Sequence, residues 1–176
     1  RVREDLARRK LSRELALATA VRIIEQTLMR VGNDVYAREN KSYGLTTLRM
    51  RHVEHDGRKI HFRFRGKAGQ EFDAELRDRR VDTALRRMEG LPGQHLFQYE
   101  DEDGETRRVQ SSDVNAYIRE TMGEEFSAKD FRTWAATVLA ALALLEYEAE
   151  DSPRVVKSNV KRAIERVARR LGNTPT

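Results

Sequence analysis

The stretch Ile60–Leu76 (IHFRFRGKAGQEFDAEL) decides the expected fold. Apolar residues alternate with charged ones on both sides of the turn Gly66–Gly69, which is the period of a half-buried strand. A hairpin turn at Asp56-Gly57 precedes this stretch, because both residues tolerate positive φ. Together with the alternation over Leu48–Arg51, the pattern predicts a three-stranded antiparallel meander with one apolar face and one charged, largely basic face.

Helical spacing dominates on either side of this meander. Before it, apolar residues recur every three or four positions from Leu17 to Val31, and Gly32-Asn33 is expected to end that helix. After it, short apolar stripes at positions 81–88 and 114–118 predict two further helices.

The last third of the chain is also expected to be mainly helical. The alanine-rich segment Trp134–Leu145 predicts a buried core helix and is too short to span a bilayer. Ser152-Pro153 can begin a last helix that Gly172 ends. The acidic, polar stretch Tyr99–Arg107 is expected to be a loop. The fold class is therefore α+β, a small sheet beside a bundle of about five or six helices, in one domain over 1–176.

Composition narrows the classes of function. The chain has 176 residues, 36% of them charged, a net charge of +5 and a pI near 9.7. This basic balance favours a polyanionic partner such as nucleic acid. The absence of cysteine excludes disulfides, thiolate nucleophiles and cysteine–zinc sites.

Histidines are the only residues whose clustering suggests a metal. His52, His55 and His61 lie near one another in the sequence, but they lack the spacing and carboxylate support of a metal site. Glycine-rich phosphate and dinucleotide loops are also missing from the sequence. We therefore expect neither a metal nor a cofactor.

Four short stretches place residues rich in hydrogen-bond donors at the edges of regular elements. They are LMRVGN at 28–33 with YARENKSYGLTTL at 36–48, FRGKAG at 64–69, KDFRTW at 129–134, and LGNTP at 171–175. Their order along the chain resembles the poxvirus-like and bacterial type IB DNA topoisomerases, whose catalytic fold is shared with the tyrosine recombinases. The resemblance runs from about Leu15 to the end of the chain.

The resemblance implies a role for each matched residue. Arg30 matches the first catalytic arginine, Lys67 the catalytic lysine and Arg132 the second arginine. Asn173 matches a position that is histidine in the poxvirus enzymes. Four further residues are expected to contact DNA, and they are Tyr36, Tyr43, Arg65 and Lys129.

The chemistry of phosphodiester cleavage supports these roles independently. Negative charge builds on the non-bridging oxygens, where two permanently charged guanidiniums can bind. The leaving 5′-oxygen needs a proton, which Lys67 at a hairpin tip can supply as general acid. Asn173 can donate a hydrogen bond as histidine does, but it cannot titrate. The basic residues at 49, 51, 63 and 65 are expected to form a general phosphate-facing surface.

The nucleophile is the departure from the family pattern. The family carries a tyrosine several residues beyond the LGNTP stretch, whereas this chain ends at Thr176 and none of its five tyrosines has that place. We therefore expect a catalytic domain without its N-terminal clamp domain and its nucleophile tail. Such a chain is expected to bind double-stranded DNA without cleaving it.

The resemblance also implies the function of the complete enzyme. It would relax supercoils as a monomer, through transient single-strand cleavage and a 3′-phosphotyrosyl link, without ATP, in the cytoplasm and associated with the nucleoid. Two alternatives stay open. A tyrosine recombinase usually carries a His-x-x-Arg motif, but Lys129 stands in the histidine's place here, which favours a topoisomerase. A non-catalytic DNA-binding module would keep the same fold.

Overall fold

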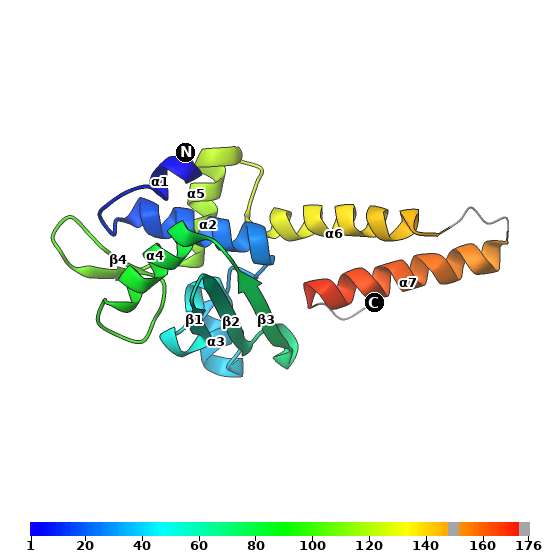
Figure 1. The fold of residues 1–176 in the computed structure, drawn as a ribbon, viewed down its shortest axis with the longest axis horizontal. Coiled ribbons are helices and arrows are strands. Elements are labelled where there is room, and N and C mark those ends of the chain that lie inside the picture. The colour runs from blue at the N-terminus through cyan, green and yellow to red at the C-terminus, as the bar shows by residue number, and fades with distance from the viewer. Residues whose placement is uncertain (148–151, 173–176) are drawn as a thin grey trace. The chain divides into compact units, whose positions relative to one another are not determined.

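The computed structural model describes residues 1–147 and 152–172 of the chain. They form two compact units, Arg1–Lys129 and Asp130–Thr176 (Figure 1). The helices and strands of the first unit are α1 (Val2–Asp5), α2 (Arg13–Thr27), α3 (Asp34–Asn40), β1 (Val53–Asp56), β2 (Lys59–Arg65), β3 (Glu71–Leu76), α4 (Arg79–Glu89), β4 (Gln98–Glu100), β5 (Thr106–Arg108) and α5 (Ser111–Met122). The remaining helices are α6 (Ala128–Leu145), which starts at the end of the first unit, and α7 (Pro153–Leu171). The mainly helical α+β fold is thus confirmed.

Helix α2 is the centre of the first unit. Ser12 caps it by accepting a hydrogen bond from the Leu15 N–H (3.4 Å), and α1, α4, α5 and β3 all contact it. Its residues 15–21, 23 and 24 are buried. The helix is therefore buried on all sides over this stretch, and not only on one face. The helix ends at Thr27 because Leu28 takes a left-handed conformation with φ 57°. The end expected at Gly32-Asn33 is therefore five residues too late.

The predicted three-stranded meander is confirmed, with antiparallel order β1-β2-β3. Its buried face includes Ile60, Phe62 and Phe64, as the alternation predicts. The first strand begins at Val53, however, and not in the segment 48–51. That segment pairs elsewhere, since the Met50 N–H donates to the Gln94 carbonyl (3.1 Å) and a β-bridge joins residues 49 and 95.

The exposed face of the meander is less basic than expected. The register sets acidic residues of β3 opposite basic ones of β2, as in the Arg63–Asp73 pair, whose Nε and Oδ2 lie 3.2 Å apart. Lys59 and Arg77 both pair with Glu75, at 3.1 and 3.0 Å. Cross-strand neighbours of opposite charge stabilise a sheet and reduce the net field of this face.

The loop expected over Tyr99–Arg107 is confined to residues 101–105, because β4 and β5 form a two-stranded hairpin around it. Asp101 organises its turn. One carboxylate oxygen accepts hydrogen bonds from the N–H groups of Asp103 and Glu105, and the other pairs with Arg107 at 2.7 Å. Acidic composition suggested a solvated loop, but these carboxylate contacts stabilise a turn between strands.

The second unit is an antiparallel helical hairpin of α6 and α7 (Figure 1). Ser152 and Pro153 begin α7 and Gly172 ends it with φ 60°, as predicted. The helix expected over 134–145 is confirmed as part of α6, but its expected burial is wrong, since Trp134 is 72% exposed and Leu145 is 79% exposed. Across residues 1–147 and 152–172, no helix is both long and apolar enough to cross a membrane.

Candidate functional site

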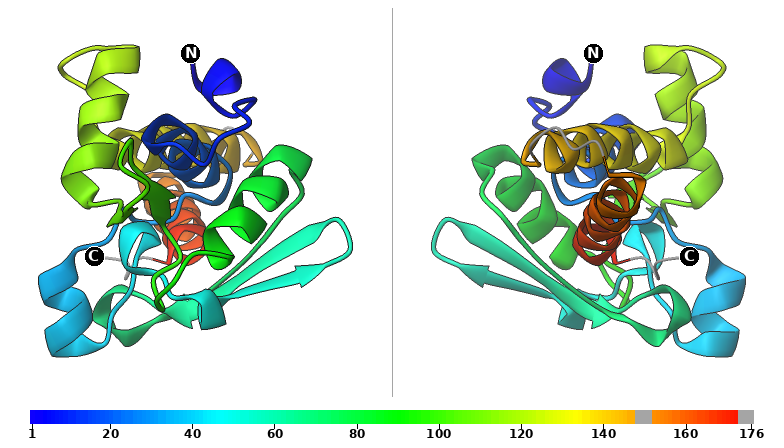
Figure 2. Two further views of the ribbon diagram at one scale, coloured as in Figure 1. Left: turned by 90° about the vertical axis from the view of Figure 1, so that its left-hand side faces the viewer. Right: turned by 90° about the vertical axis from the view of Figure 1, so that its right-hand side faces the viewer.

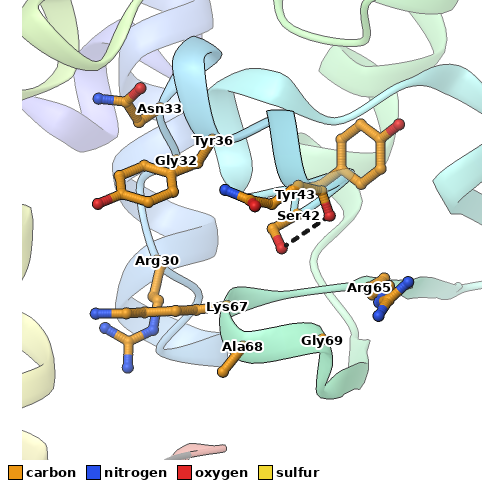
Figure 3. Close-up of a pocket in the computed structure, with 11 residues that line it drawn as sticks. Arg30, Gly32, Asn33, Tyr36, Ser42, Tyr43, Arg65, Lys67, Ala68 and Gly69 are labelled. Carbon is orange, nitrogen blue, oxygen red and sulfur yellow. Dashed lines mark hydrogen bonds between the residues drawn. The ribbon is translucent and has the colours of Figure 1, made fainter. Parts of the chain in front are cut away.

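A cavity of about 570 Å³ opens in the first unit between the end of α2, helix α3 and the β2–β3 turn (Figure 3). Five of the eight predicted site residues line it. They are Arg30, Tyr36, Tyr43, Arg65 and Lys67. These residues come from segments up to 37 positions apart, so the fold, and not the sequence spacing, brings them together.

The backbone of Arg30 is held by the segment that follows α3. The Leu45 N–H donates to the Arg30 carbonyl (2.9 Å), and the Thr46 N–H donates to the Val31 carbonyl (2.9 Å). The Thr46 hydroxyl donates to the same Val31 carbonyl at 3.0 Å. Since Thr46 is buried, this clamp fixes where the Arg30 side chain starts.

Lys67 stands on the tight turn between β2 and β3. The Gly66 N–H donates to the Gln70 carbonyl (2.7 Å), which closes the turn, and Ala68 adopts φ 58°. Lys67 itself is exposed and lines the cavity with Arg30 (Figure 3). An exposed ammonium on a hydrogen-bonded turn is well placed to meet an approaching anion.

The two tyrosines of the cavity differ in how firmly they are held. Tyr36 on α3 is 60% exposed. Tyr43 is half-buried, and its hydroxyl accepts a hydrogen bond from the Arg51 guanidinium (3.3 Å). Its N–H donates to the Arg65 carbonyl (2.8 Å), so the segment after α3 is joined to β2. Its ring also lies 4.5 Å from that of His52.

The lining of the cavity is electropositive. It includes Arg30, Arg65 and Lys67 and contains no aspartate or glutamate. It also contains the neutral side chains of Asn33, Asn40 and Ser42, which the sequence did not single out. Of these, Asn33 caps α3 by accepting from the Val35 N–H (2.8 Å), and an Asn before a short helix could have signalled this. Cations beside neutral polar groups suit an anion with several oxygens.

The structure describes two of the other three predicted residues, Arg132 and Lys129. Arg132 is 9% exposed in the second unit, where its guanidinium donates to the Leu171 carbonyl (2.7 Å). That bond ties the start of α6 to the end of α7. Lys129 is exposed in the first turn of α6. Asn173 lies outside the described residues.

The histidines do not assemble a metal site in the part of the chain that the structure describes. His52 is buried, and its Nδ1 accepts a hydrogen bond from the Arg49 N–H (3.1 Å). Burial, and then the nearby charges of Arg51 and Arg49, lower the pKa of His52 to about 4. His55 faces Asp82 and Glu89, at 2.6 and 3.1 Å. Each histidine thus has a separate structural environment.

Known proteins are similar to this chain in sequence and in fold. A family described as "Eukaryotic DNA topoisomerase I, catalytic core" matches residues 1–176. The DNA topoisomerase 1B of Acanthamoeba polyphaga mimivirus is 38% identical over 165 residues, which cover 90% of this chain and 49% of that protein. The XerH site-specific recombinase bound to its difH substrate superposes with a TM-score of 0.50 at 15% identity, covering 89% of this chain and 50% of that one. The chain thus spans about half the length of these relatives, and the recombinase likeness concerns the fold alone.

Proposed function

The chain belongs to the eukaryotic DNA topoisomerase I catalytic-core family, and from this premise we propose that it is the catalytic domain of a type IB enzyme that relaxes supercoiled DNA. Its partner is double-stranded DNA. The observation that carries the proposal is the single cavity lined by Arg30, Lys67 and Arg65 with Tyr36 and Tyr43. Three cations without a carboxylate in the same lining favour a phosphodiester over a neutral ligand.

Arg30 and Lys67 have different roles in the proposed reaction. A tyrosine hydroxyl loses its proton to solvent as its oxygen attacks the scissile phosphorus, a 3′-phosphotyrosyl ester forms, and the bond from phosphorus to the 5′-oxygen breaks. Arg30 stabilises the charge that develops on the non-bridging oxygens. Lys67 donates a proton to the departing 5′-oxygen, which leaves as a hydroxyl. Resealing reverses each step, so the bond energy is conserved and ATP is not needed.

Residues outside this cavity complete the assignment. Arg132 is the second guanidinium of the reaction, because its permanent charge and fork of N–H donors suit the non-bridging oxygens of a phosphate. Asn173 supplies a neutral hydrogen bond. Lys129, Tyr36, Tyr43 and Arg65 position the DNA backbone. Arg49, Arg51 and Arg63 have partners in Gln94, Tyr43 and Asp73, so we give them at most a minor part in this contact.

The nucleophile is proposed to be a tyrosine beyond Thr176 in the complete protein. By resemblance to the family it follows residues 171–175 closely, within about a dozen residues, so as to reach the phosphate that Arg30 binds. Residues 1–176 alone are then expected to bind duplex DNA without cleaving it. We expect the complete enzyme to act as a monomer in the cytoplasm, associated with the nucleoid.

Plasmid relaxation by the complete protein tests this function. Negatively supercoiled plasmid should be relaxed in EDTA and without ATP, and denaturing the reaction should trap protein on the 3′ side of a nick with a free 5′-hydroxyl. Replacing the downstream tyrosine by phenylalanine should abolish both results. Relaxation that requires a divalent metal, or adducts on the 5′ side, would contradict the mechanism.

A tyrosine recombinase is the second candidate, favoured by the XerH-like fold. Lys129 stands three residues before Arg132, where recombinases usually carry the histidine of a His-x-x-Arg motif. Strand exchange between two copies of one DNA site would favour the recombinase, whereas relaxation of plasmids of unrelated sequence favours the topoisomerase. A protein that binds DNA and does neither would be a non-catalytic module.

A further inference from the structure

A second cavity, of about 400 Å³, lies in the first unit between the segment after α1 and one face of α4. It shares no lining residue with the cavity of Arg30 and Lys67. In Figures 1 and 2, α1 (dark blue) lies at the opposite end of this unit from α3 (light blue). The second cavity therefore needs an explanation separate from the proposed cleavage site.

Five arginines line this cavity, and they are Arg8, Arg9, Arg79, Arg80 and Arg87. Arg8 pairs with Asp5 (2.8 Å). Within residues 1–147 and 152–172, the other four have no carboxylate partner. Two of them fasten the walls together, because the Arg87 guanidinium donates to the Arg9 carbonyl (2.8 Å) and that of Arg80 to the Arg3 carbonyl (3.4 Å). The cations are thus gathered around one hollow.

Nearby carboxylates are already engaged elsewhere. Asp78 accepts hydrogen bonds from the first N–H groups of α4 with one oxygen and pairs with Arg22 through the other (3.1 Å). Asp82 pairs with His55 and Arg86. The acids of α4 therefore leave the charge of the arginine cavity uncompensated.

Two of these arginines lie at a position that is electrostatically unfavourable for a cation. Arg79 and Arg80 are the first two residues of α4, where the helix dipole is positive and favours anions over cations. Like charges clustered in this way repel one another, and a bound anion would relieve that repulsion. The floor is apolar, because Leu6, Leu15 and Ala84 are buried beneath the guanidiniums. An arginine-lined hollow has the chemistry of a phosphate site, because guanidinium forks match phosphate oxygens.

We propose that this cavity is a second anion site, which binds a ligand carrying adjacent phosphates. Four uncompensated guanidiniums exceed what one monoanion neutralises, so closely spaced phosphates fit better than a single carboxylate. Two sources share this chemistry, the backbone of a nucleic acid segment and a free polyphosphate. The site needs neither Arg30 nor Lys67, so its existence does not depend on the proposed cleavage reaction.

The test compares two double variants of the complete protein. Arg9→Gln/Arg79→Gln removes two guanidiniums that have no side-chain partner in the described part of the chain. Arg58→Gln/Arg162→Gln removes the same charge from two exposed positions outside both cavities. Thermal unfolding should be alike for both. Calorimetric titration with inorganic pyrophosphate at low salt should show binding at least about tenfold weaker in the first variant than in the second.

Lys67→Ala separates this site from the cleavage site, since it should keep the pyrophosphate binding that Arg9→Gln/Arg79→Gln loses, whatever it loses at its own cavity. Equal pyrophosphate binding by both double variants, or no binding by the wild type, would overturn the proposal. A duplex titration then identifies the source. A salt slope smaller by about 2 in Arg9→Gln/Arg79→Gln than in the control indicates nucleic acid backbone. An unchanged slope with lost pyrophosphate binding indicates a free polyphosphate.

Discussion

Gly44 lies so close to Gly32 that a Cβ atom on Gly44 would stand 2.5 Å from the Gly32 Cα and 2.8 Å from the Arg30 carbonyl oxygen. Both obstacles are backbone atoms, which cannot rotate away as a flexible side chain can. The φ of Gly44 is −146°, which any residue can adopt. Glycine is therefore required at this position by the close approach to Gly32, and not by the backbone conformation. The contact holds Arg30 against the segment that leads from α3 to the sheet.

The substitution Gly44→Ala should therefore push the Arg30 segment away. We expect the free energy of unfolding to fall by about 1–3 kcal/mol, as for other overpacked sites, and duplex affinity to fall with it. Chemical denaturation and DNA titration measure the two effects. Gly90→Ala is the matched control, because Gly90 has φ −73° and the new Cβ would lie no closer than 3.3 Å to its nearest neighbour, the Arg87 carbonyl oxygen. Similar losses in the two variants would contradict the role given to the Gly32–Gly44 contact.

Lys67→Ala in the complete protein should separate cleavage from binding. Loss of a general acid is expected to slow cleavage by about 10²–10⁴-fold, while duplex affinity changes little. Rapid-quench measurement of the covalent adduct gives the cleavage rate. A substrate with sulfur as the leaving 5′-atom should restore much of it, since a thiolate leaves without a proton. Arg58→Ala, at the other hairpin turn, should change neither quantity. If Lys67→Ala lowers binding and cleavage equally, Lys67 is only a phosphate contact.

His52 predicts a pH dependence of stability. Its folded-state pKa is lowered to about 4 by burial and by Arg51 and Arg49, against about 6.5 in the unfolded chain. Below about pH 6.5 the unfolded state takes up a proton that the folded state refuses, so stability falls as the pH drops from 6.5 towards 4. Urea unfolding across that range measures the slope.

The substitution His52→Asn should flatten this slope. It should not remove the slope entirely, because burial also lowers the pKa of His95. An unchanged slope in His52→Asn would show that His52 is not the group responsible.

A buried hydrogen bond between Tyr117 and Asp5 is expected to stabilise the fold in a pH-dependent way. The Tyr117 hydroxyl donates to Asp5 Oδ2 at 2.7 Å, and both residues are buried. Burial acts to raise the pKa of Asp5, but the hydrogen bonds from Tyr117 and Arg8 outweigh it and lower that pKa. This contribution to stability is therefore present at neutral pH and is lost as the pH falls through the folded-state value.

Tyr117→Phe should lower the free energy of unfolding at neutral pH by about 1–3 kcal/mol, since it leaves a buried acceptor short of a donor. Acid unfolding should also begin at a higher pH. Tyr99→Phe is the control, as the Tyr99 hydroxyl has no partner within the described ranges. If Tyr117→Phe lowers the free energy of unfolding no more than Tyr99→Phe does, the bond to Asp5 does not stabilise the fold.

Much of the fold was predictable from local pattern. Alternation over residues 60–76 predicted β2 and β3, and Ser152-Pro153 with Gly172 predicted both ends of α7. One error arose where a distant segment competes for backbone hydrogen bonds. Leu48 and Met50 alternate like a strand, but they pair with residues 94–96, more than 40 positions away. Periodicity cannot choose between such partners.

The candidate site was also predictable only in part from the sequence. Short motifs picked out Arg30, Lys67, Tyr36, Tyr43 and Arg65, and the fold places all five in one cavity. Their catalytic and DNA-binding roles remain predictions, as do those of Lys129, Arg132 and Asn173. Asn33 and Ser42 lie within those motifs, but the sequence alone assigned them no role in the site. No motif pointed to the arginine cavity beside α4, because the sequence around an exposed arginine does not show which other arginines lie near it in the fold.

By itself, the sequence determined the α+β class, the strand and turn pattern around Lys67, and the family resemblance, because each depends on residues close together in the chain. Only the tertiary structure decided that the Arg30 carbonyl meets the Leu45 N–H, that Gly44 touches Gly32, and that the arginines of α4 face those after α1. Those contacts depend on how buried apolar faces pack together. The sequence around each residue does not reveal which distant residue it will contact.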